Sequence, residues 1–471
     1  MTPSSIVIYG FTGDLVKRKL LPSLYRLQAN GRLDDSVQIF GVSRRDIDIK
    51  ELREELFAFI KDSDGHCKEQ ELDKLCARIS ILTADISKPE DYVGLKQQLD
   101  DKLGPTCSLK LFYFAVPPSL FEVVIDNMVE HKMHECGGSS ASRLMIEKPF
   151  GHDLASAQKL IDKIKPHFGE DSIYRVDHYL AKDMVQNILY FRFHNPIVSE
   201  IWNGSNIKSI QISALESLDI QGRAAFYEQT GALRDMLQGH LLQLAALATM
   251  DEPSSFEPLD ILRRKDQILG SIKPMDNIDK DTVRAQYNGY RQETGNSDSN
   301  TETFAAVRFE IDRPEWEGVP IVMRAGKAMS DKITELNIVF ETEKSHHHQN
   351  TLTFRIHPHE GVALKLAAKR PGLDNEPDQI TIDHCYSGPD MADAYDRILH
   401  DGIIGDQTLF PSDKQILASW EFIQPVLDHW SKDGQSLGFY EKGAANVPES
   451  DALVGKKGWV VHDSWVCNTN H

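Results

Sequence analysis

Residues 6–15 read IVIYGFTGDL, an apolar strand pattern that runs directly into a glycine-containing turn and then into a helical pattern. Gly10 and Gly13 permit a tight turn at which a pyrophosphate group can approach the backbone. The N–H groups and the dipole at the start of the following helix also favour anionic oxygens. A short G-x-x-G pattern is a weak signal alone, so an ordinary strand–helix turn is the alternative interpretation.

The chain around this turn favours dinucleotide binding. Over the first 177 residues, short apolar runs alternate with helical patterns such as residues 118–131 and 154–168. Most runs are almost continuously apolar, as strands covered on both faces must be. The alternation predicts a parallel, doubly wound sheet with right-handed crossovers. The predicted strands are residues 6–9, 37–42, 79–82, 109–116, 144–146 and 174–176.

The pattern changes after about residue 200, where strand-like runs follow one another with little helix between them. This predicts a large, mainly antiparallel sheet, with amphipathic helices over residues 231–250 and 412–429 covering one face. We therefore expect an α/β, Rossmann-like dinucleotide-binding domain over residues 1–177 and an α+β substrate-binding and oligomerisation domain over residues 178–471. The predicted strands of the second domain are residues 207–215, 302–309, 319–324, 334–342, 350–357 and 362–368.

The charge composition of the chain bears on whether it binds nucleic acid or membranes. The 471 residues include 52 Lys plus Arg and 71 Asp plus Glu, a formal net charge of −19. This excess of negative charge argues against nonspecific binding to nucleic acid or to an anionic membrane. No apolar run approaches the roughly 20 residues that span a bilayer, and the N-terminus has no signal-peptide pattern. A cytoplasmic location is expected.

Cysteine and histidine spacing gives little sign of a metal. The six cysteines are scattered and form no C-x-x-C pattern, so reduced thiols are expected rather than a disulfide framework or a zinc site. Three consecutive side chains rarely converge on one ion, so the run His346–His348 is interpreted as a solvated loop. The cysteines are Cys67, Cys76, Cys107, Cys136, Cys385 and Cys467.

Two arginines, Arg44 and Arg45, follow the second predicted strand. A site that prefers NAD usually has Asp or Glu near this point to hold the ribose hydroxyls. Guanidinium groups suit the 2′-phosphate of NADP through forked, charge-assisted hydrogen bonds. We therefore predict NADP as the cofactor, with an exposed basic loop as the alternative. At the end of the fourth predicted strand, residues 115–118 would shape the crevice for the nicotinamide. The predicted cofactor-binding residues are Gly10, Thr12, Gly13, Asp14, Leu15, Arg44, Ala115 and Pro117.

Three further motifs are IEKPFG (residues 146–151), RVDHYLAKD (175–183) and LRDMLQGHLLQ (233–243). Together with GFTGDL, they resemble the glucose-6-phosphate dehydrogenase family. The pattern continues in MRAGKAM, DAYDRILHD and GDQTLF, which begin at residues 323, 393 and 405. The resemblance therefore covers about residues 6–430 in the same order.

His178 and Lys182 are four residues apart, which predicts that they share one face of a helix, with Tyr179 alongside. An imidazole, a phenol and an ammonium on one face could bind a phosphate, and a surface ion-pair cluster is the alternative. The resemblance implies that these three residues bind the phosphate of the substrate, with Lys332 as an additional contact.

His240 lies on the apolar side of a predicted helix, where a buried histidine with a satisfied hydrogen bond would be the ordinary interpretation. The resemblance implies that His240 is the general base, and that Asp177 holds its tautomer and stabilises its imidazolium form. No metal is expected, because the imidazole moves the proton and the nicotinamide carries the hydride.

The resemblance also implies contacts to the sugar hydroxyls. Lys148 follows the fifth predicted strand, where ligands of open α/β sheets bind, and it matches a family lysine near the sugar and the nicotinamide. Pro149 matches a family cis-proline, and His357 occupies a position where the family usually has Gln. The other implied substrate-binding residues are Lys19, Glu216, Asp235 and Lys327.

The implied reaction is oxidation of β-D-glucose 6-phosphate to 6-phospho-D-glucono-1,5-lactone with NADP, the first step of the pentose phosphate pathway. The resemblance further implies a homodimer or homotetramer formed through the antiparallel sheet. Two alternatives remain open, a dehydrogenase of unphosphorylated hexose and a noncatalytic sugar-phosphate sensor. The cationic set at His178 and Lys182 counts against the first, and the pair Asp177 and His240 counts against the second.

Overall fold

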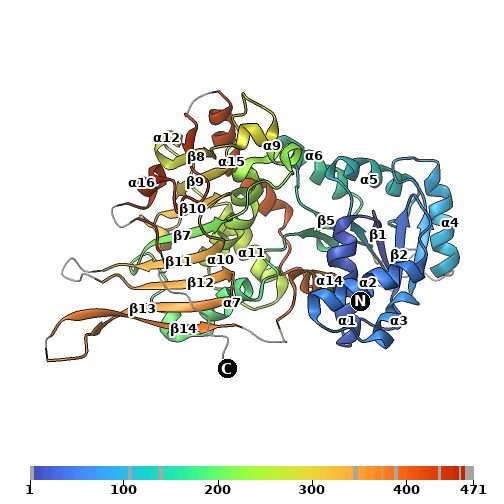
Figure 1. Cartoon of the computed structure of the whole chain (residues 1–471), viewed down its shortest axis with the longest axis horizontal. Helices are drawn as coiled ribbons and strands as arrows, with labels where there is room; N and C mark the ends of the chain where they lie inside the picture. The colour runs from blue at the N-terminus through green and yellow to red at the C-terminus, as the bar shows by residue number, and fades with distance from the viewer. Residues whose placement is uncertain are drawn as a thin grey trace. The chain divides into compact units, whose positions relative to one another are not determined.

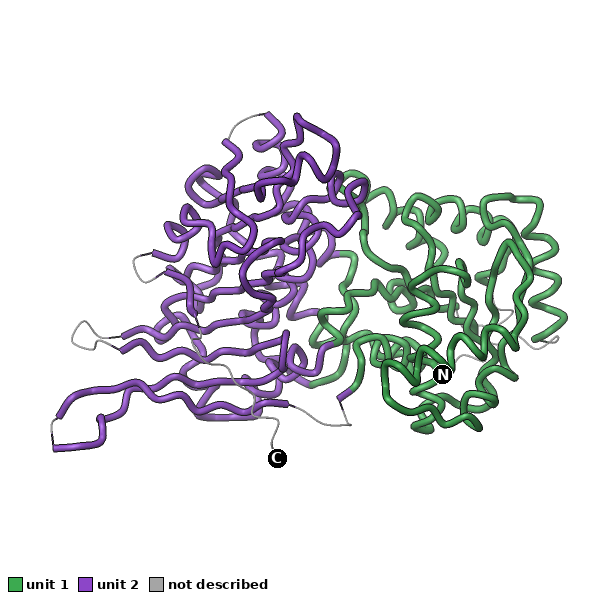
Figure 2. Tube along the Cα trace, viewed as in Figure 1, with its two compact units in different colours: residues 1–181, 256–262, 392–413 green, residues 182–255, 263–391, 414–471 purple. Residues whose placement is uncertain are grey.

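The computed structural model describes residues 5–103, 109–135, 142–342, 348–373, 375–386, 391–432, 436–455 and 458–461. The chain folds into two compact units, shown in separate colours in Figure 2. The first is Met1–Ala181 with Phe256–Leu262 and Ala392–Asp413, and the second contains the remainder. The predicted first domain ends at residue 177, whereas the first unit runs to Ala181 and also includes the two later segments.

The first unit is built on a six-stranded sheet in the order β3-β2-β1-β4-β5-β6. All neighbouring strands are parallel, as predicted. This order is typical of dinucleotide-binding folds. The strands are β1 (Ser5–Tyr9), β2 (Gln38–Ser43), β3 (Ile79–Thr83), β4 (Lys110–Phe114), β5 (Arg143–Glu147) and β6 (Ile173–Val176).

Helices cover both faces of this sheet, so every residue of β1 and β4 is buried. Figure 1 shows α5 and α6 on one side of the sheet and α1 and α3 on the other. Helix α14 comes from the late segment of the chain and packs on α1. The helices are η1 (Val16–Leu20), α1 (Leu21–Ala29), α2 (Ile49–Asp64), α3 (Glu69–Cys76), α4 (Asp91–Leu103), η2 (Pro118–Leu120), α5 (Phe121–Glu130), α6 (Leu154–Ile164), η3 (Glu170–Ser172) and α14 (Ala394–Ile404).

The second unit is built on a nine-stranded sheet in the order β14-β13-β12-β11-β7-β10-β9-β8-β15. It is mainly antiparallel, as predicted, although β7 pairs with β10 and β8 pairs with β15 in parallel. Strands β8, β14 and β15 were not predicted. The strands are β7 (Ile207–Leu215), β8 (Thr282–Tyr287), β9 (Phe304–Phe309), β10 (Ile321–Gly326), β11 (Ile333–Phe340), β12 (Thr351–His357), β13 (Gly361–Lys369), β14 (Pro377–Cys385) and β15 (Gly438–Tyr440).

Helices η4 and α10 pack on the centre of this sheet, and α7 packs on β12. Helices α11 and α15 each begin in a segment of the first unit and continue in the second. The helices are α7 (Asp183–Phe193), α8 (Pro196–Ser199), α9 (Ala224–Ala232), η4 (Leu233–Leu241), α10 (Leu242–Thr249), α11 (Pro258–Leu269), α12 (Ile278–Asp281), α13 (Tyr290–Thr294), η5 (Pro314–Trp316), α15 (Asp413–Ser431), η6 (Pro448–Ser450) and α16 (Asp451–Val454).

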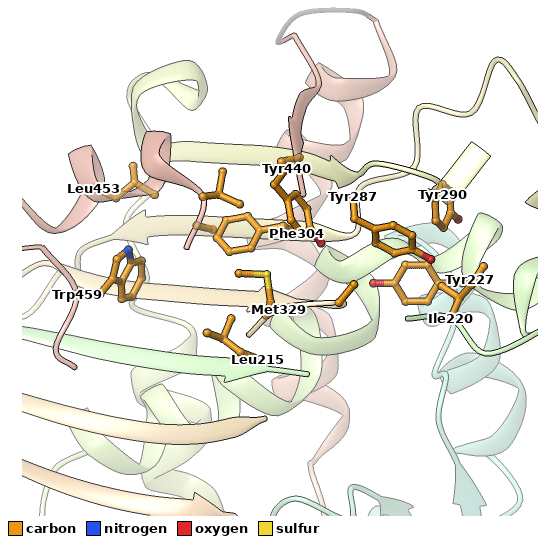
Figure 3. Packing of buried hydrophobic residues seen from close by; sticks show 14 of the residues in the cluster. Leu215, Ile220, Tyr227, Tyr287, Tyr290, Phe304, Met329, Tyr440, Leu453 and Trp459 are labelled. Atoms are coloured by element: carbon orange, nitrogen blue, oxygen red, sulfur yellow. The ribbon is translucent and has the colours of Figure 1, made fainter. Parts of the chain in front are cut away.

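An aromatic-rich core lies near the carboxyl end of β10 (Figure 3). Phe304 and Tyr440 pack edge to face, with ring centroids 6.2 Å apart. The Tyr440 hydroxyl donates a hydrogen bond of 2.7 Å to the carbonyl oxygen of Lys327. This core therefore holds the backbone of the loop that carries Lys327.

The expectation of reduced cysteines is wrong for Cys385, which is disulfide-bonded. Cys67 and Cys76 are free thiols. Cys107, Cys136 and Cys467 lie outside the described residues, as do His346 and His347.

Within the described ranges, no helix combines the length and apolar character needed to cross a bilayer. In the same part of the chain, no group of three or more His, Cys, Asp or Glu side chains could hold a metal ion.

Candidate active site

The glycine turn after β1 has the close backbone approach that the sequence predicts. Gly10 has a φ of +80°, and a Cβ atom there would lie 2.5 Å from the carbonyl oxygen of Ala115. The Gly13 N–H donates a hydrogen bond of 2.9 Å to the Gly10 carbonyl. Thr12 and Asp14 are exposed beside this turn. A larger residue at position 10 would therefore push the turn away from the end of β4.

The end of β2 lies beside this turn, because the Phe11 N–H donates to the Val42 carbonyl at 3.1 Å. Arg44 and Arg45 follow and are both exposed. The Arg45 N–H donates to the Ser43 hydroxyl at 3.2 Å, which fixes the backbone after the strand. The predicted basic residues thus stand at the same edge of the sheet as the glycine turn.

Lys148 and Asp177 follow two neighbouring strands, since β5 pairs with β6. The Lys148–Pro149 peptide bond is cis, as the resemblance implies. Asp177 is only 3% exposed, and its Oδ1 accepts a hydrogen bond of 3.0 Å from the Tyr179 N–H. Both residues therefore stand at the carboxyl edge of the sheet, where ligands of this fold bind.

Glu147, beside Lys148, was not singled out from the sequence. Its Oε1 accepts a hydrogen bond of 2.5 Å from the Tyr113 hydroxyl, and Tyr395 of the late segment also bonds to it. Burial raises the pKa of Glu147 to about 7, and the nearby Asp177 charge acts in the same direction, against the two tyrosines and Lys148. These surroundings therefore favour the protonated form of Glu147 more than an exposed position would.

Lys19 lies in η1, the short π-helix after the glycine turn. Its Nζ is 3.2 Å from Oδ2 of Asp393, whose Oδ1 caps α14 by accepting the Tyr395 N–H at 2.9 Å. The late segment of the first unit therefore contacts Lys19, one of the residues predicted to bind the substrate.

The prediction that His178 and Lys182 share a helix face is wrong. Residues 178–181 form a turn, and α7 begins only at Asp183, with Lys182 as its N-cap residue. The Leu180 N–H donates a hydrogen bond of 3.1 Å to the Asp177 carbonyl, and the Tyr179 N–H donates to the Asp177 side chain. These two bonds stabilise a turn instead of a helix. His178 is exposed, and its ring centroid lies 5.1 Å from that of Tyr179.

In the second unit, the Lys327 ammonium lies close to Glu216 and Asp235, the two carboxylates predicted to bind the sugar. Leu215 and Gly326 are partners in the parallel register of β7 and β10, so the residues that follow them are neighbours. Lys327 Nζ lies 2.7 Å from Glu216 Oε2 and 4.0 Å from Asp235 Oδ2. Its side chain is only 5% exposed and stands over the Tyr227 ring.

His357 lies near the predicted phosphate-binding lysines. Burial, together with the nearby Lys332, Lys182 and His359, lowers the pKa of His357 to about 4, whereas Glu216 acts in the opposite direction. The imidazole is therefore neutral at physiological pH. It can exchange hydrogen bonds there, as the usual Gln would, without adding a charge.

The helix predicted around His240 is present, and His240 and Asp235 lie in its first part, η4, which is a π-helix of nine residues followed directly by α10. His240 is 4% exposed. The start of η4 is fixed by buried Glu302, whose Oε1 accepts the Leu233 N–H at 2.9 Å. Gly231, with a φ of +65°, lets this carboxylate approach, since a Cβ atom there would collide with it.

Each unit thus holds part of the predicted site. The first contains the predicted cofactor residues together with Lys19, Lys148, Asp177, His178 and Tyr179. The second contains Lys182, Glu216, Asp235, His240, Lys327 and Lys332. A first unit with this fold is typical of dinucleotide-dependent dehydrogenases.

Comparison with known proteins identifies the family. Its NAD binding domain matches residues 7–187, and its C-terminal domain matches residues 189–466. The chain belongs to the glucose-6-phosphate dehydrogenase family, and the predicted fold class is confirmed.

Individual relatives match over almost the whole chain. Glucose-6-phosphate 1-dehydrogenase of Chlamydia muridarum is 38% identical, covering 97% of this chain and 96% of that protein. The Bacillus subtilis enzyme is 36% identical, covering 96% and 97%. A solved structure of glucose-6-phosphate dehydrogenase in complex with its substrate glucose-6-phosphate is 33% identical. It has a TM-score of 0.89 and covers 97% of this chain and 98% of its own.

Proposed function

We propose that this protein oxidises β-D-glucose 6-phosphate to 6-phospho-D-glucono-1,5-lactone with NADP, the reaction that opens the pentose phosphate pathway. The observation that carries this proposal is the match across both units to a family of that activity, with a TM-score of 0.89 to a substrate-bound member.

The chain offers a fitting place for NADP, because Gly10 leaves no room for a side chain against Ala115 and two exposed arginines follow β2. The nicotinamide, when bound, accepts a hydride from the anomeric carbon of the sugar. The residues proposed to hold this cofactor are Gly10, Thr12, Gly13, Asp14, Leu15, Arg44, Ala115, Pro117 and Lys148.

We assign the proton transfer to His240, which removes the proton of the anomeric hydroxyl as hydride leaves the same carbon. Imidazole suits this role because the ordinary pKa of histidine is about 6.5. Asp177 is proposed to orient this imidazole and to stabilise its protonated form. General-base assistance of this kind is worth roughly 10²- to 10⁴-fold in rate.

The remaining residues are assigned to the substrate. His178, Tyr179, Lys182 and Lys332 are proposed to bind the phosphate, because cationic and hydroxyl donors suit its anionic oxygens. Lys19, Lys148, Glu216, Asp235 and Lys327 are proposed to hydrogen-bond the sugar hydroxyls. The contact between Lys327 and Glu216 supports this part of the assignment, since paired charged groups offer both donors and acceptors.

Absorbance of reduced nicotinamide tests the proposal, with glucose 6-phosphate or glucose as substrate and NADP or NAD as cofactor. We expect turnover with glucose 6-phosphate and NADP to exceed turnover with glucose. His240→Asn should lower kcat by roughly 10²- to 10⁴-fold and leave KM almost unchanged, because it removes the base but little of the binding surface. Near-normal turnover of the variant would rule out His240 as the base.

We also propose that the protein is a homodimer or homotetramer and that it acts in the cytoplasm. The oligomer proposal is supported by exposed apolar side chains on the edge strand β14, including Ile380 and Ile382. The proposal of a cytoplasmic location rests on the proposed reaction.

A further inference from the structure

A carboxylate from a distant part of the second unit contacts Lys182. Lys182 Nζ lies 3.4 Å from Oε1 of Glu360, which belongs to the turn between β12 and β13. The other oxygen of this carboxylate, Oε2, accepts a hydrogen bond of 2.8 Å from the Met184 N–H. Glu360 thus contacts both the lysine side chain and the first turn of α7.

Glu360 is the fixed member of this pair. Its side chain is 9% exposed, against 33% for Lys182. A carboxylate at a helix N-terminus is stabilised by the N–H groups and the dipole there. The Glu360 backbone is fixed as well, because its carbonyl accepts the Tyr386 N–H at 2.7 Å. The lysine, with its flexible stem, is the member whose position depends on the other.

Lys182 has other cationic groups in its neighbourhood. Lys182, Lys332 and His359 each act on the His357 imidazole in the same electrostatic direction, so all three lie near that ring, where the Glu216 carboxylate acts in the opposite direction. Like charges repel, and a free Lys182 ammonium would move outward into water. The Glu360 carboxylate offsets this repulsion at a defined point.

We propose that Glu360 is a positioning residue for substrate phosphate, acting by holding the Lys182 ammonium at the start of α7. This inference rests on the proposed function, in which Lys182 binds the phosphate of glucose 6-phosphate. Glu360 itself donates no hydrogen bond to an anion, so its effect on affinity must pass through Lys182.

A double-mutant cycle with Lys182→Ala and Glu360→Gln isolates this effect. Gln keeps an oxygen for the Met184 N–H but presents no charge to the lysine. We expect Glu360→Gln to raise KM for glucose 6-phosphate by roughly three- to tenfold, between the effects of an exposed and a buried charged contact. We expect kcat to change by less than about twofold. In the Lys182→Ala background, Glu360→Gln should have no further effect on KM.

Two further variants support the interpretation. Glu360→Asp keeps the charge but shortens the reach, so its KM should lie between those of the parent and of Glu360→Gln. Glu376→Gln is the matched control, because it removes an exposed carboxylate, paired with Arg370 at 3.4 Å, on the hairpin that begins next to Glu360. It should leave KM unchanged. Thermal unfolding of each variant reports any loss of folding.

The other outcomes overturn the inference in distinguishable ways. A lower KM for Glu360→Gln would mean that the carboxylate only repels the phosphate. An equal rise of KM in the Lys182→Ala background, or for glucose as well, would mean a structural role. If Lys182→Ala raises KM for glucose 6-phosphate but Glu360→Gln does not, only this inference fails. If Lys182→Ala itself leaves KM unchanged, the proposed phosphate-binding role of Lys182 fails too.

Discussion

Several lysines that the sequence analysis assigned to the substrate contact a carboxylate that is distant in the chain. Lys327 contacts Glu216, and Lys19 contacts Asp393. Burying an ammonium without a partner is costly, so a lysine with a 5% exposed side chain needs such a contact. These contacts also limit the positions of the ammonium groups, which matters if each is to meet one substrate oxygen.

At the same scale, Arg44 tests the choice of cofactor. If it binds the 2′-phosphate, Arg44→Ala should raise KM for NADP roughly tenfold or more, since a charged hydrogen bond contributes about 1.5–3 kcal/mol. KM for NAD, which lacks this phosphate, should hardly change. Steady-state kinetics with both cofactors measure the difference. Added salt should weaken NADP binding modestly in the parent protein, because Arg44 is exposed.

Arg45→Ala is the control, because it removes the same charge from the neighbouring exposed position. A phosphate contact specific to Arg44 predicts a smaller effect for this variant. Equal losses of affinity for NADP and NAD in Arg44→Ala would instead mean that the guanidinium stacks on the adenine, and the 2′-phosphate assignment would be wrong.

At the scale of elements, two candidate site residues, His240 and Asp235, lie on a π-helix whose start is fixed from outside. Helices of this type are rare and concentrate at functional sites. Glu302, from the segment before β9, accepts the first N–H of η4. The geometry of the proposed base therefore depends on a residue that is distant in sequence.

Glu302→Ala should destabilise the protein by about 1–3 kcal/mol, because it leaves the buried Leu233 N–H without an acceptor. It should also lower kcat by roughly ten- to hundredfold if the shift of η4 misplaces His240. Glu302→Gln keeps an amide oxygen that can accept the Leu233 N–H, so this variant should retain most stability and turnover. Thermal unfolding and kcat measure both effects. Equal losses in the two variants would contradict the assigned role.

The sequence predicts elements well where burial imposes a pattern. The strands of the parallel sheet lie within one or two residues of the predicted ends because most of them are almost continuously apolar. Strand β14 was missed because it begins at Pro377 and is mostly exposed, and β15 has only three residues. The turn after Asp177 and the π-type geometry around His240 depend on particular hydrogen bonds. The spacing of apolar residues along the sequence does not reveal such bonds, so neither feature was predicted.

The same limit applies to the candidate site. Motifs placed Lys148, Asp177 and the glycine turn at the carboxyl edge of the first sheet, because parallel strands bring their carboxyl ends together. Glu302 and Glu360 carry no motif of their own. Each supports a site element only through a contact with a residue far away in the chain.

At the scale of the whole molecule, the nine-stranded sheet ends in two strands of very different character. Strand β15 is short, whereas β14 has nine residues, most of them exposed. Ile380 and Ile382 are 44% and 57% exposed and are two residues apart, so they project from the same face of β14. A long edge strand with exposed apolar side chains is a surface that pairs readily with another chain.

If a second copy covers this edge, the parent protein should have a mass in solution that is two or four times its chain mass of 53.2 kDa. The double variant Ile380→Lys and Ile382→Lys should shift the protein toward the single-chain mass, because association would bury two added ammonium groups. Thr381→Lys adds one charge on the opposite face of the same strand and should leave the mass unchanged. Light scattering coupled to size exclusion measures all three. A parent protein at 53.2 kDa would contradict the oligomer proposal, and an unshifted double variant would mean that the copies associate through another surface.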